Sequence, residues 1–331
     1  ESGYTYPPLL AREIEQVVGE YLFDCTNFRT DDKDDLLRQV YEMTDKRFRL
    51  AEHLLETKPW ELFAMVEIGL DRMHHGFWKD LDERHHRHDP AGEHGDAILD
   101  YHRHLDSLLA RLLAHVDEET AVLVVSDHGA KRMEGGIRIN EWLRREGLLE
   151  TLGEPNGITS LRDAGVDWAR TTAWGEGGYY GRIFLNVRGR EPQGTVAPEE
   201  AERVRDELAE RLAAIPGPDG APLATTVYRP EEVYEEVNGI APDLLVYFDD
   251  LAWRAVGTVG GDEGIHTFEN DTGPDDANHA QDGLLIMAGP GIEPGLAEGM
   301  HLLDVAPTVL ELLGIEPLQS MRGKSLLSRP R

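Results

Sequence analysis

Two short stretches of the sequence place an aspartate and a histidine directly after an apolar run. Asp71 and His75 lie in DRMHH, and Asp127 and His128 lie in SDHG. Carboxylate oxygen and imidazole nitrogen suit Zn²⁺ or Mn²⁺, and no thiol competes with them in these stretches. The residue types therefore indicate a site for a divalent metal ion.

The spacing within each pair allows both side chains to reach one ion. Residues four apart share a face of a helix, so Asp71 and His75 can bind from a single turn. Asp127 and His128 would diverge on an extended strand, but a turn eased by Gly129 can aim both the same way. Either pair alone could also be a helix-capping aspartate or a hydrogen-bonded core histidine.

The elements between the pairs predict that all four side chains meet. Residues 62–68 and 121–125 are apolar runs of strand length, and residues 96–114 carry a leucine-rich helical face. A strand–helix–strand unit is right-handed and its strands are parallel, so both strand ends lie at the same sheet edge. Ligands bind at this edge of open α/β sheets. Packing alone does not readily explain two such pairs there.

Two other interpretations of the polar residues are weaker. Ser126 in SDHG resembles a triad nucleophile, but triad residues are rarely consecutive and the sequence lacks a G-x-S-x-G turn. A histidine-rich stretch lies in polar, loop-like sequence with no strand to hold it, so exposed surface is the better interpretation. Its members are His85, His86, His88, His94, His102 and His104.

Composition limits the class of protein. The chain has 331 residues, 40% of them apolar, which suits one large α/β domain or a core with an inserted lobe. It carries 63 acidic and 33 basic residues, so its surface repels nucleic-acid backbones. Cys25 is the only cysteine, which excludes an internal disulfide and a thiolate metal site. Without a long apolar run or a signal peptide, we expect no membrane span and a cytoplasmic protein.

The rest of the chain is expected to form a smaller inserted lobe and then the last part of the core. Loops, short strands and an amphipathic helix predict a smaller α+β lobe over residues 151–262. A third strand of the core is predicted at 284–288. The expected fold is therefore α/β, with a mostly parallel sheet and helices on both faces. Residues 1–150 form its first part, with a helical region at the N-terminal end, and residues 263–331 close it.

Three stretches together resemble the alkaline phosphatase superfamily, and most closely its type I phosphodiesterase/nucleotide pyrophosphatase branch. They are GLDRMHHGFW, VLVVSDHGA and NHAQDGLLIMAGPGI, and they stand in the family's order. INEWLRREGLL, IFLNVRGREPQGTV and DVAPTVLELLGIEPLQSMRGKSLL extend the likeness over nearly the whole chain from about residue 57. The resemblance implies an alkaline phosphatase-like core, two divalent metal ions, usually zinc, and hydrolysis of a small phosphate ester.

The resemblance also implies which residues hold each ion. One ion would be held by Asp71, His75 and His279. The second ion would be held by Asp127 and His128. His74 is the alternative to His75, and the family pattern favours the histidine four residues after the aspartate. His266 is the alternative to His279, and the resemblance alone selects between these two.

One part of the family pattern is missing. In the family, an earlier segment supplies a further aspartate ligand and a threonine or serine nucleophile, and residues 1–55 contain neither pattern. We therefore interpret the chain as a C-terminal portion of a longer enzyme, or as a homologue that lost its nucleophile. By itself it should hydrolyse phosphate esters poorly. The alternatives are a sulfatase or phosphomutase of the same superfamily, and a non-catalytic binding module that retains metal.

Overall fold

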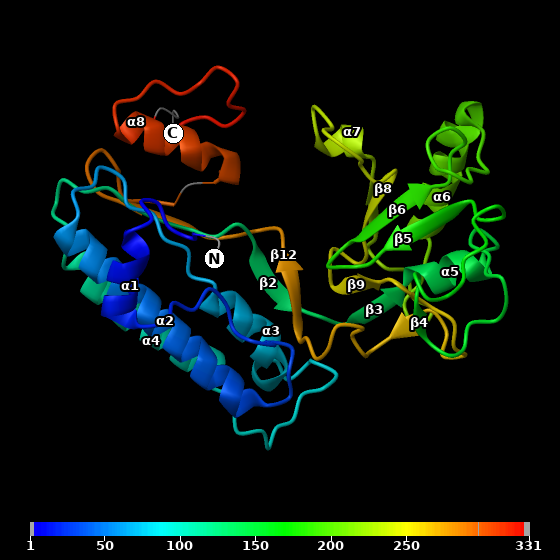
Figure 1. Cartoon of the computed structure of the whole chain (residues 1–331), viewed down its shortest axis with the longest axis horizontal. Helices are drawn as coiled ribbons and strands as arrows, with labels where there is room; N and C mark the ends of the chain where they lie inside the picture. The colour runs from blue at the N-terminus through cyan, green and yellow to red at the C-terminus, as the bar shows by residue number, and fades with distance from the viewer. Residues whose placement is uncertain (1–2, 297, 328–331) are drawn as a thin grey trace.

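The computed structural model describes residues 3–296 and 298–327, and it consists of two halves that lie side by side (Figure 1). The left half in Figure 1 is mainly helical, and the right half contains most of the strands. Strands β2 and β12 lie between the two halves. In the described ranges, no helix has both the length and the apolar character needed to cross a membrane.

Four helices form the helical layer of the left half. They are α1 (Leu10–Val18), α2 (Lys33–Thr57), α3 (Gly69–Leu81) and α4 (Ala97–Leu113). Helix α2 begins after Asp32, whose side chain accepts a hydrogen bond from the backbone N–H of Asp35, a regular N-terminal cap. The helices α2, α3 and α4 share one apolar core. Its buried residues are Leu36, Val40, Met73, Phe77, Ile98 and Tyr101.

Two short antiparallel ladders follow the helical layer. Strand β1 (Val122–Val125) pairs with β13 (Leu285–Ala288), and β2 (Gly129–Arg132) pairs with β12 (Ala277–Ala280). Beyond them follow η2 (Leu302–Asp304) and α8 (Val305–Leu312), and α8 lies above the helical layer in Figure 1. These ladders bring residues 277–288 back to residues 122–132.

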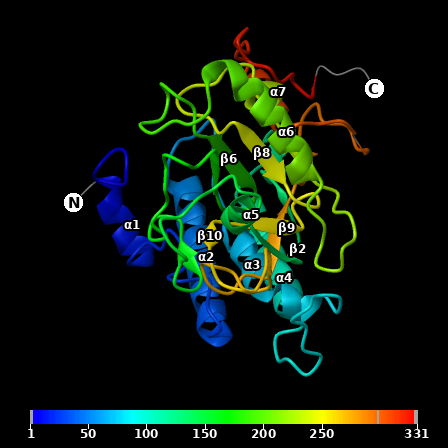
Figure 2. The same cartoon turned by 90° about the vertical axis from the view of Figure 1, so that its right-hand side faces the viewer.

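The right half is built on a four-stranded antiparallel sheet in the order β5-β6-β8-β7. Figure 2 looks onto this half and shows α6 lying across β8. Buried residues from the sheet and from the helices α5 and α6 form its core, among them Ile139, Ile183, Leu208, Leu212 and Val246. The elements of the sheet and its helices are β5 (Ala173–Glu176), β6 (Gly181–Leu185), β7 (Thr226–Tyr228), β8 (Leu244–Tyr247), α5 (Ile139–Arg145), η1 (Pro198–Glu200), α6 (Ala201–Ala213) and α7 (Pro230–Val233).

Two smaller sheets adjoin this one. Strand β3 is central between β11 and β9, and β4 pairs with β10. The pair β3–β9 is parallel and the other ladders of the described residues are antiparallel. The strands are β3 (Gly135–Arg138), β4 (Thr159–Ser160), β9 (Trp253–Val256), β10 (Thr258–Val259) and β11 (His266–Thr267).

The expected α/β content is therefore present, but as several small sheets, and the mostly parallel sheet is not confirmed. The predicted helix over 96–114 is present as α4, and the predicted strands at 121–125 and 284–288 are present as β1 and β13, in antiparallel pairing. The predicted strand over 62–68 is wrong, because no described strand pairs with these residues. Apolar composition favours a strand, but a strand also needs a hydrogen-bonded neighbour. The predicted boundaries at residues 150 and 262 stay a prediction.

Candidate metal centre

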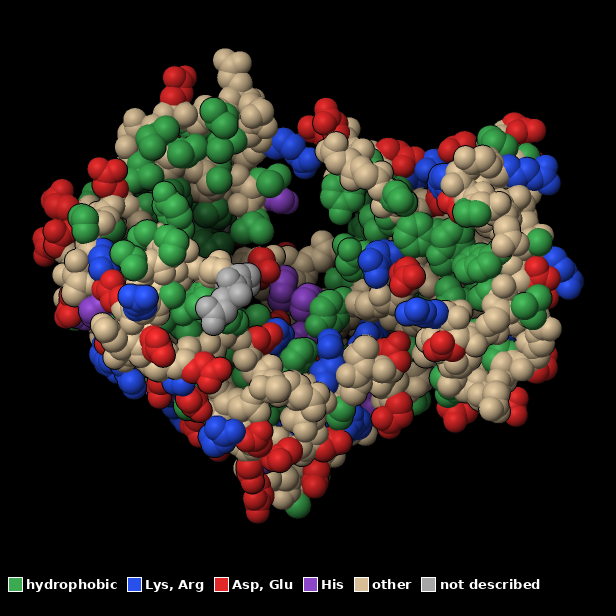
Figure 3. All heavy atoms as spheres, viewed as in Figure 1, with side chains coloured by type: hydrophobic (Ala, Val, Ile, Leu, Met, Phe, Trp, Pro, Cys, Tyr) green, Lys and Arg blue, Asp and Glu red, His purple; other side chains and the backbone are tan. Residues whose placement is uncertain are grey.

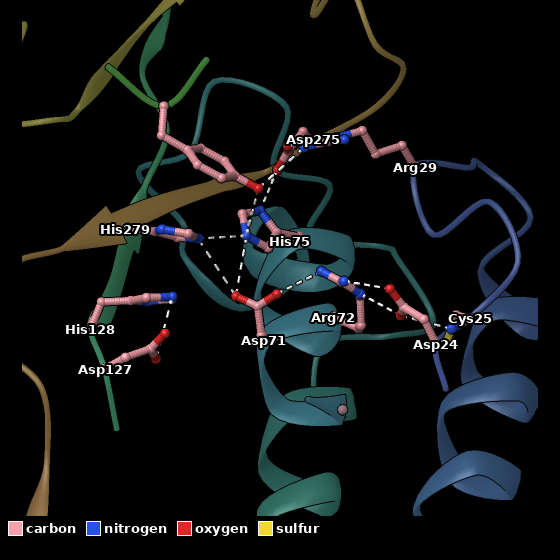
Figure 4. A network of polar contacts seen from close by, with 12 residues as sticks. Asp24, Cys25, Arg29, Asp71, Arg72, His75, Asp127, His128, Asp275 and His279 are labelled. Carbon is pink, nitrogen blue, oxygen red and sulfur yellow. Dashed lines mark hydrogen bonds and ion pairs between the residues drawn. The ribbon is translucent and has the colours of Figure 1, made fainter. Parts of the chain in front are cut away.

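Side chains from three segments of the chain converge between the two halves (Figure 4). Asp71 and His75 come from α3, His128 from the turn between β1 and β2, and His279 from β12. One possible ligand atom from each of Asp71, His128 and His279 lies within 4.8 Å of the other two. Figure 3 shows histidine side chains at the floor of a hollow between the halves. The side chains of Asp71, His128 and His279 are each about a quarter exposed, so the cluster is accessible from outside.

A buried network at the start of α3 positions the first two side chains. Glu67 Oε1 accepts hydrogen bonds from the Thr44 hydroxyl, the Tyr101 hydroxyl and the backbone N–H of Gly69. A Cβ atom at Gly69 would lie only 2.0 Å from the Tyr101 hydroxyl, so no larger residue fits at this turn. The helix starts at Gly69 in this network, which directs Asp71 and His75 toward β12.

Strand register brings the other two histidines together. In the β2–β12 ladder His279 is opposite Ala130, two residues after His128. The rings of His128 and His279 stack with centroids 3.6 Å apart and an angle of 14° between their planes. A Cβ atom at Gly129 would lie 2.2 Å from the backbone oxygen of Asp282, so the close approach of the two segments requires glycine here.

The Nε2 atoms of His75 and His279 face each other inside the cluster. They are 3.3 Å apart, and the Asp71 Oδ1 atom lies 3.4 Å from the first and 3.7 Å from the second. Burial, together with His128 and His75, lowers the pKa of His279 to about 4, so its imidazole is neutral at pH 7. Burial opposes ionisation of Asp71, but its hydrogen bond to His75 and the positive charges of His75 and Arg72 together lower the pKa of Asp71 to about 2. A carboxylate and a neutral imidazole are the forms that bind metal ions.

Asp275 orients His75 from the side away from the cluster. Its Oδ1 atom lies 2.7 Å from His75 Nδ1, and its Oδ2 atom accepts a 2.9 Å hydrogen bond from Arg29 Nε. Burial opposes protonation of His75, but the hydrogen bonds to Asp275 and Asp71 raise its pKa to about 9. The proton on Nε2 must therefore leave before this nitrogen can bind an ion. A carboxylate behind the histidine is the usual way to orient such a ligand.

Not every residue singled out in the sequence lies inside the cluster. The Asp127 side chain is 76% exposed and lies at the edge, 3.6 Å from His128 Nε2. His74 packs against Trp78 and His102, and His266 faces the backbone oxygen of Pro216. In the part of the chain that the structure describes, the cluster of Asp71, His128 and His279 is the one group of three or more residues suited to a metal ion.

Two residues of the centre carried no signal in the sequence motifs. Tyr179, from the loop between β5 and β6, packs its ring 4.1 Å from that of His279, and its hydroxyl lies 3.4 Å from His75 Nε2. Asp275 is far from His75 in the chain and stands four residues before His279. That spacing repeats the one between Asp71 and His75, and it is the single hint that sequence reasoning could have used for Asp275.

Replacing Asp275 with asparagine should lower the affinity for Zn²⁺ by about 10- to 100-fold, because His75 loses the charged partner that orients it. Isothermal titration calorimetry of the wild-type and variant chains measures the change. Asp262→Asn is the control, since Asp262 is an exposed loop residue. An unchanged affinity in Asp275→Asn would show that the carboxylate does not support the centre.

Comparison with known proteins identifies the family of the chain. The model of the family described as type I phosphodiesterase / nucleotide pyrophosphatase matches residues 2–275, which is most of the chain. No curated protein matches the chain. The family match spans two of the three segments that build the cluster and includes Asp275. The chain therefore belongs to the type I phosphodiesterase/nucleotide pyrophosphatase family, a member of the alkaline phosphatase superfamily.

Proposed function

We propose that this chain carries the metal centre of a divalent-metal-dependent hydrolase of small phosphate esters, of the phosphodiesterase or nucleotide pyrophosphatase type. The observation that supports it best is the convergence of Asp71, His75, His128 and His279 from segments far apart in the sequence. Family membership supports the same class of reaction.

The proposed ligands are those that the sequence motifs single out. Asp71, His75 and His279 would hold one ion. Asp127 and His128 would belong to a second, with zinc as the expected metal and manganese as the alternative. The donor set fits such ions, since a carboxylate oxygen of Asp71 and the Nε2 atoms of His75 and His279 lie within 3.7 Å of one another. The division between two ions stays a prediction, because His128 lies with Asp71 and His279.

The bound ions would activate an oxygen nucleophile and polarise the phosphate ester. The residues of this chain hold and orient the centre: Asp275 fixes the ring of His75, and Tyr179 covers one side of His279. In the described part of the chain, no serine or threonine hydroxyl hydrogen-bonds to the clustered histidines or to Asp71. We propose that the family's nucleophile lies outside this sequence, or has been lost.

Exposed apolar residues support a nucleophile segment outside this sequence. Residues 62–68 form no strand in the described part of the chain, and Val66 among them is 79% exposed. Strands β1 and β13 pair only with each other there, and Ile286 on β13 is also exposed. Free strand edges with exposed apolar side chains normally find a partner. A strand supplied by the missing segment would complete the parallel, alkaline phosphatase-like sheet that we propose for the whole enzyme.

The proposal is tested by assaying an aryl phosphodiester with added Zn²⁺ or Mn²⁺. We expect the chain alone to turn over at least about 10³-fold more slowly than a form extended upstream by its own reading frame, because the nucleophile is absent from it. A chelator should abolish turnover by the extended form. Rapid turnover by the chain alone would show that the nucleophile lies within it. Full metal loading without turnover by the extended form would instead favour a metal-retaining binding module.

A further inference from the structure

A cavity of about 440 Å³ adjoins the metal centre on the far side of Tyr179. Tyr179 lines the cavity and also packs against His279, so this side chain belongs to both sites. The volume is within the range of small-molecule sites. The charged residues that line it are Arg29, Arg162, Arg254, Glu176 and Asp271.

The lining carries three guanidinium groups against two carboxylates, in a chain whose formal net charge is −30. The two arginines nearest the centre share one carboxylate with it. Arg29 Nε donates to Asp275 Oδ2 at 2.9 Å, and Arg254 Nη1 lies 3.9 Å from the same atom. Asp275 also hydrogen-bonds to His75. The Asp275 carboxylate therefore lies between the two cavity arginines and a proposed metal ligand.

Arg254 is the residue in this lining with unmet hydrogen-bonding capacity. It is 5% exposed, and neither its Nε nor its Nη1 atom has a hydrogen-bond partner. Its nearest carboxylates, Asp271 at 3.6 Å and Asp275 at 3.9 Å, are beyond hydrogen-bonding distance. A buried guanidinium with unbonded N–H groups is costly unless an acceptor completes it. Its planar fork matches the paired oxygens of a phosphate or carboxylate.

We propose that this cavity binds a second anionic group of the substrate, a phosphate or carboxylate distinct from the phosphate at the metal centre. The substrates would then be phosphate esters with two separated anionic groups. Arg254 would bind the second group with its unpaired N–H donors, and Arg29 would add positive charge beside it. The link to a substrate rests on the proposed hydrolase function, whereas binding of an anion in the cavity does not.

The test uses metal-free chain, so that binding at the metal centre does not contribute. Isothermal titration calorimetry with inorganic phosphate should detect binding, and Arg254→Met should weaken it at least about tenfold. Asp271→Asn should strengthen it, because one carboxylate that repels the anion is removed. The control Arg188→Met, at an exposed arginine of the same half, should leave the affinity unchanged. A parallel titration with acetate distinguishes a phosphate site from a general carboxylate site.

Loss of affinity in Arg254→Met and gain in Asp271→Asn support the cavity, since a purely structural role would not move affinity in opposite directions. The inference is overturned if metal-free wild-type chain binds neither anion at millimolar concentration, or if neither variant changes the affinity. If Arg254→Met does not fold, the phosphate affinity of Asp271→Asn tests the site by itself. An affinity equal to that of the wild-type chain would contradict the inference.

Two further readouts separate this inference from the proposed function. His279→Ala should lose metal yet still bind phosphate in the cavity, so failure of one site leaves the other measurable. In the extended, active form, Arg254→Met should raise KM for an ester with a second phosphate at least about tenfold more than KM for a singly charged aryl diester. Equal changes in both KM values would contradict the role in substrate selection.

Discussion

Replacing His279 with alanine should lower the affinity for Zn²⁺ by about 100-fold or more and leave the fold intact. His279 presents Nε2 to His75 at 3.3 Å and stacks on His128, so its removal opens the cluster from one side. Loss of residues that only orient a ligand already costs about 10- to 100-fold, and loss of a ligand should cost at least as much. Strand β12 is held through its backbone ladder with β2, which an alanine does not disturb.

Isothermal titration calorimetry and metal analysis after dialysis would measure this loss. Far-ultraviolet circular dichroism and thermal unfolding of the metal-free chain would show whether the fold is kept. His115→Ala is the matched control, because His115 lies on the surface and pairs with Glu56 at 3.3 Å. If His279→Ala binds Zn²⁺ as tightly as the control does, His279 is not a ligand and the proposed centre is wrong.

Replacing Glu141 with glutamine should lower the free energy of unfolding at pH 7 by about 2–3 kcal/mol. Glu141 lies on α5 with its side chain fully buried. It accepts hydrogen bonds from Arg144, from Arg145 at 2.7 Å, and from the backbone N–H of Gly260 at 2.9 Å. It thus joins α5 to the loop that follows β10. A glutamine removes the charge and places N–H groups beside the two guanidinium groups.

The same residue predicts how stability depends on pH. Burial opposes ionisation of Glu141, but the bonds from Arg144, Arg145 and Gly260 lower its pKa from 4.5 to about 2. A lowered carboxyl pKa stabilises the folded state above the unfolded-state pKa, and this stabilisation is lost as the pH falls toward 2. The wild-type chain should therefore lose about 3 kcal/mol from this group between pH 5 and pH 2. The Glu141→Gln variant should not show this loss of unfolding free energy between pH 5 and pH 2.

Urea unfolding at a series of pH values would measure both effects. Glu154→Gln is the matched control, because Glu154 contacts the same Arg144 at 3.3 Å but its side chain is 86% exposed. Exposed ion pairs contribute little, so this control should stay within about 0.5 kcal/mol of wild type. A Glu141→Gln chain as stable as the control at pH 7 would show that the buried carboxylate does not hold α5.

Several features of this protein were determined by local sequence. The apolar periodicity of residues 96–114 predicts helix α4, and the valine-rich run before SDHG predicts β1. Spacing also predicts that Asp71 and His75 share one face, and in α3 their carboxylate and imidazole are 3.4 Å apart. These features depend on contacts within a few residues, which the order of residue types specifies directly.

Other features depended on the tertiary structure alone. The run at 62–68 has the composition of a strand, yet pairing requires a neighbour that no local pattern can specify. The register of β2 with β12 places His279, and not His266, beside His128. Asp275 and Arg254 carried no motif, and their roles arise from burial next to His75 and Tyr179, residues far away in the chain. Contacts between residues far apart in the chain produce no periodic pattern of residue types. Only the tertiary structure therefore shows which charged side chains lie next to each other.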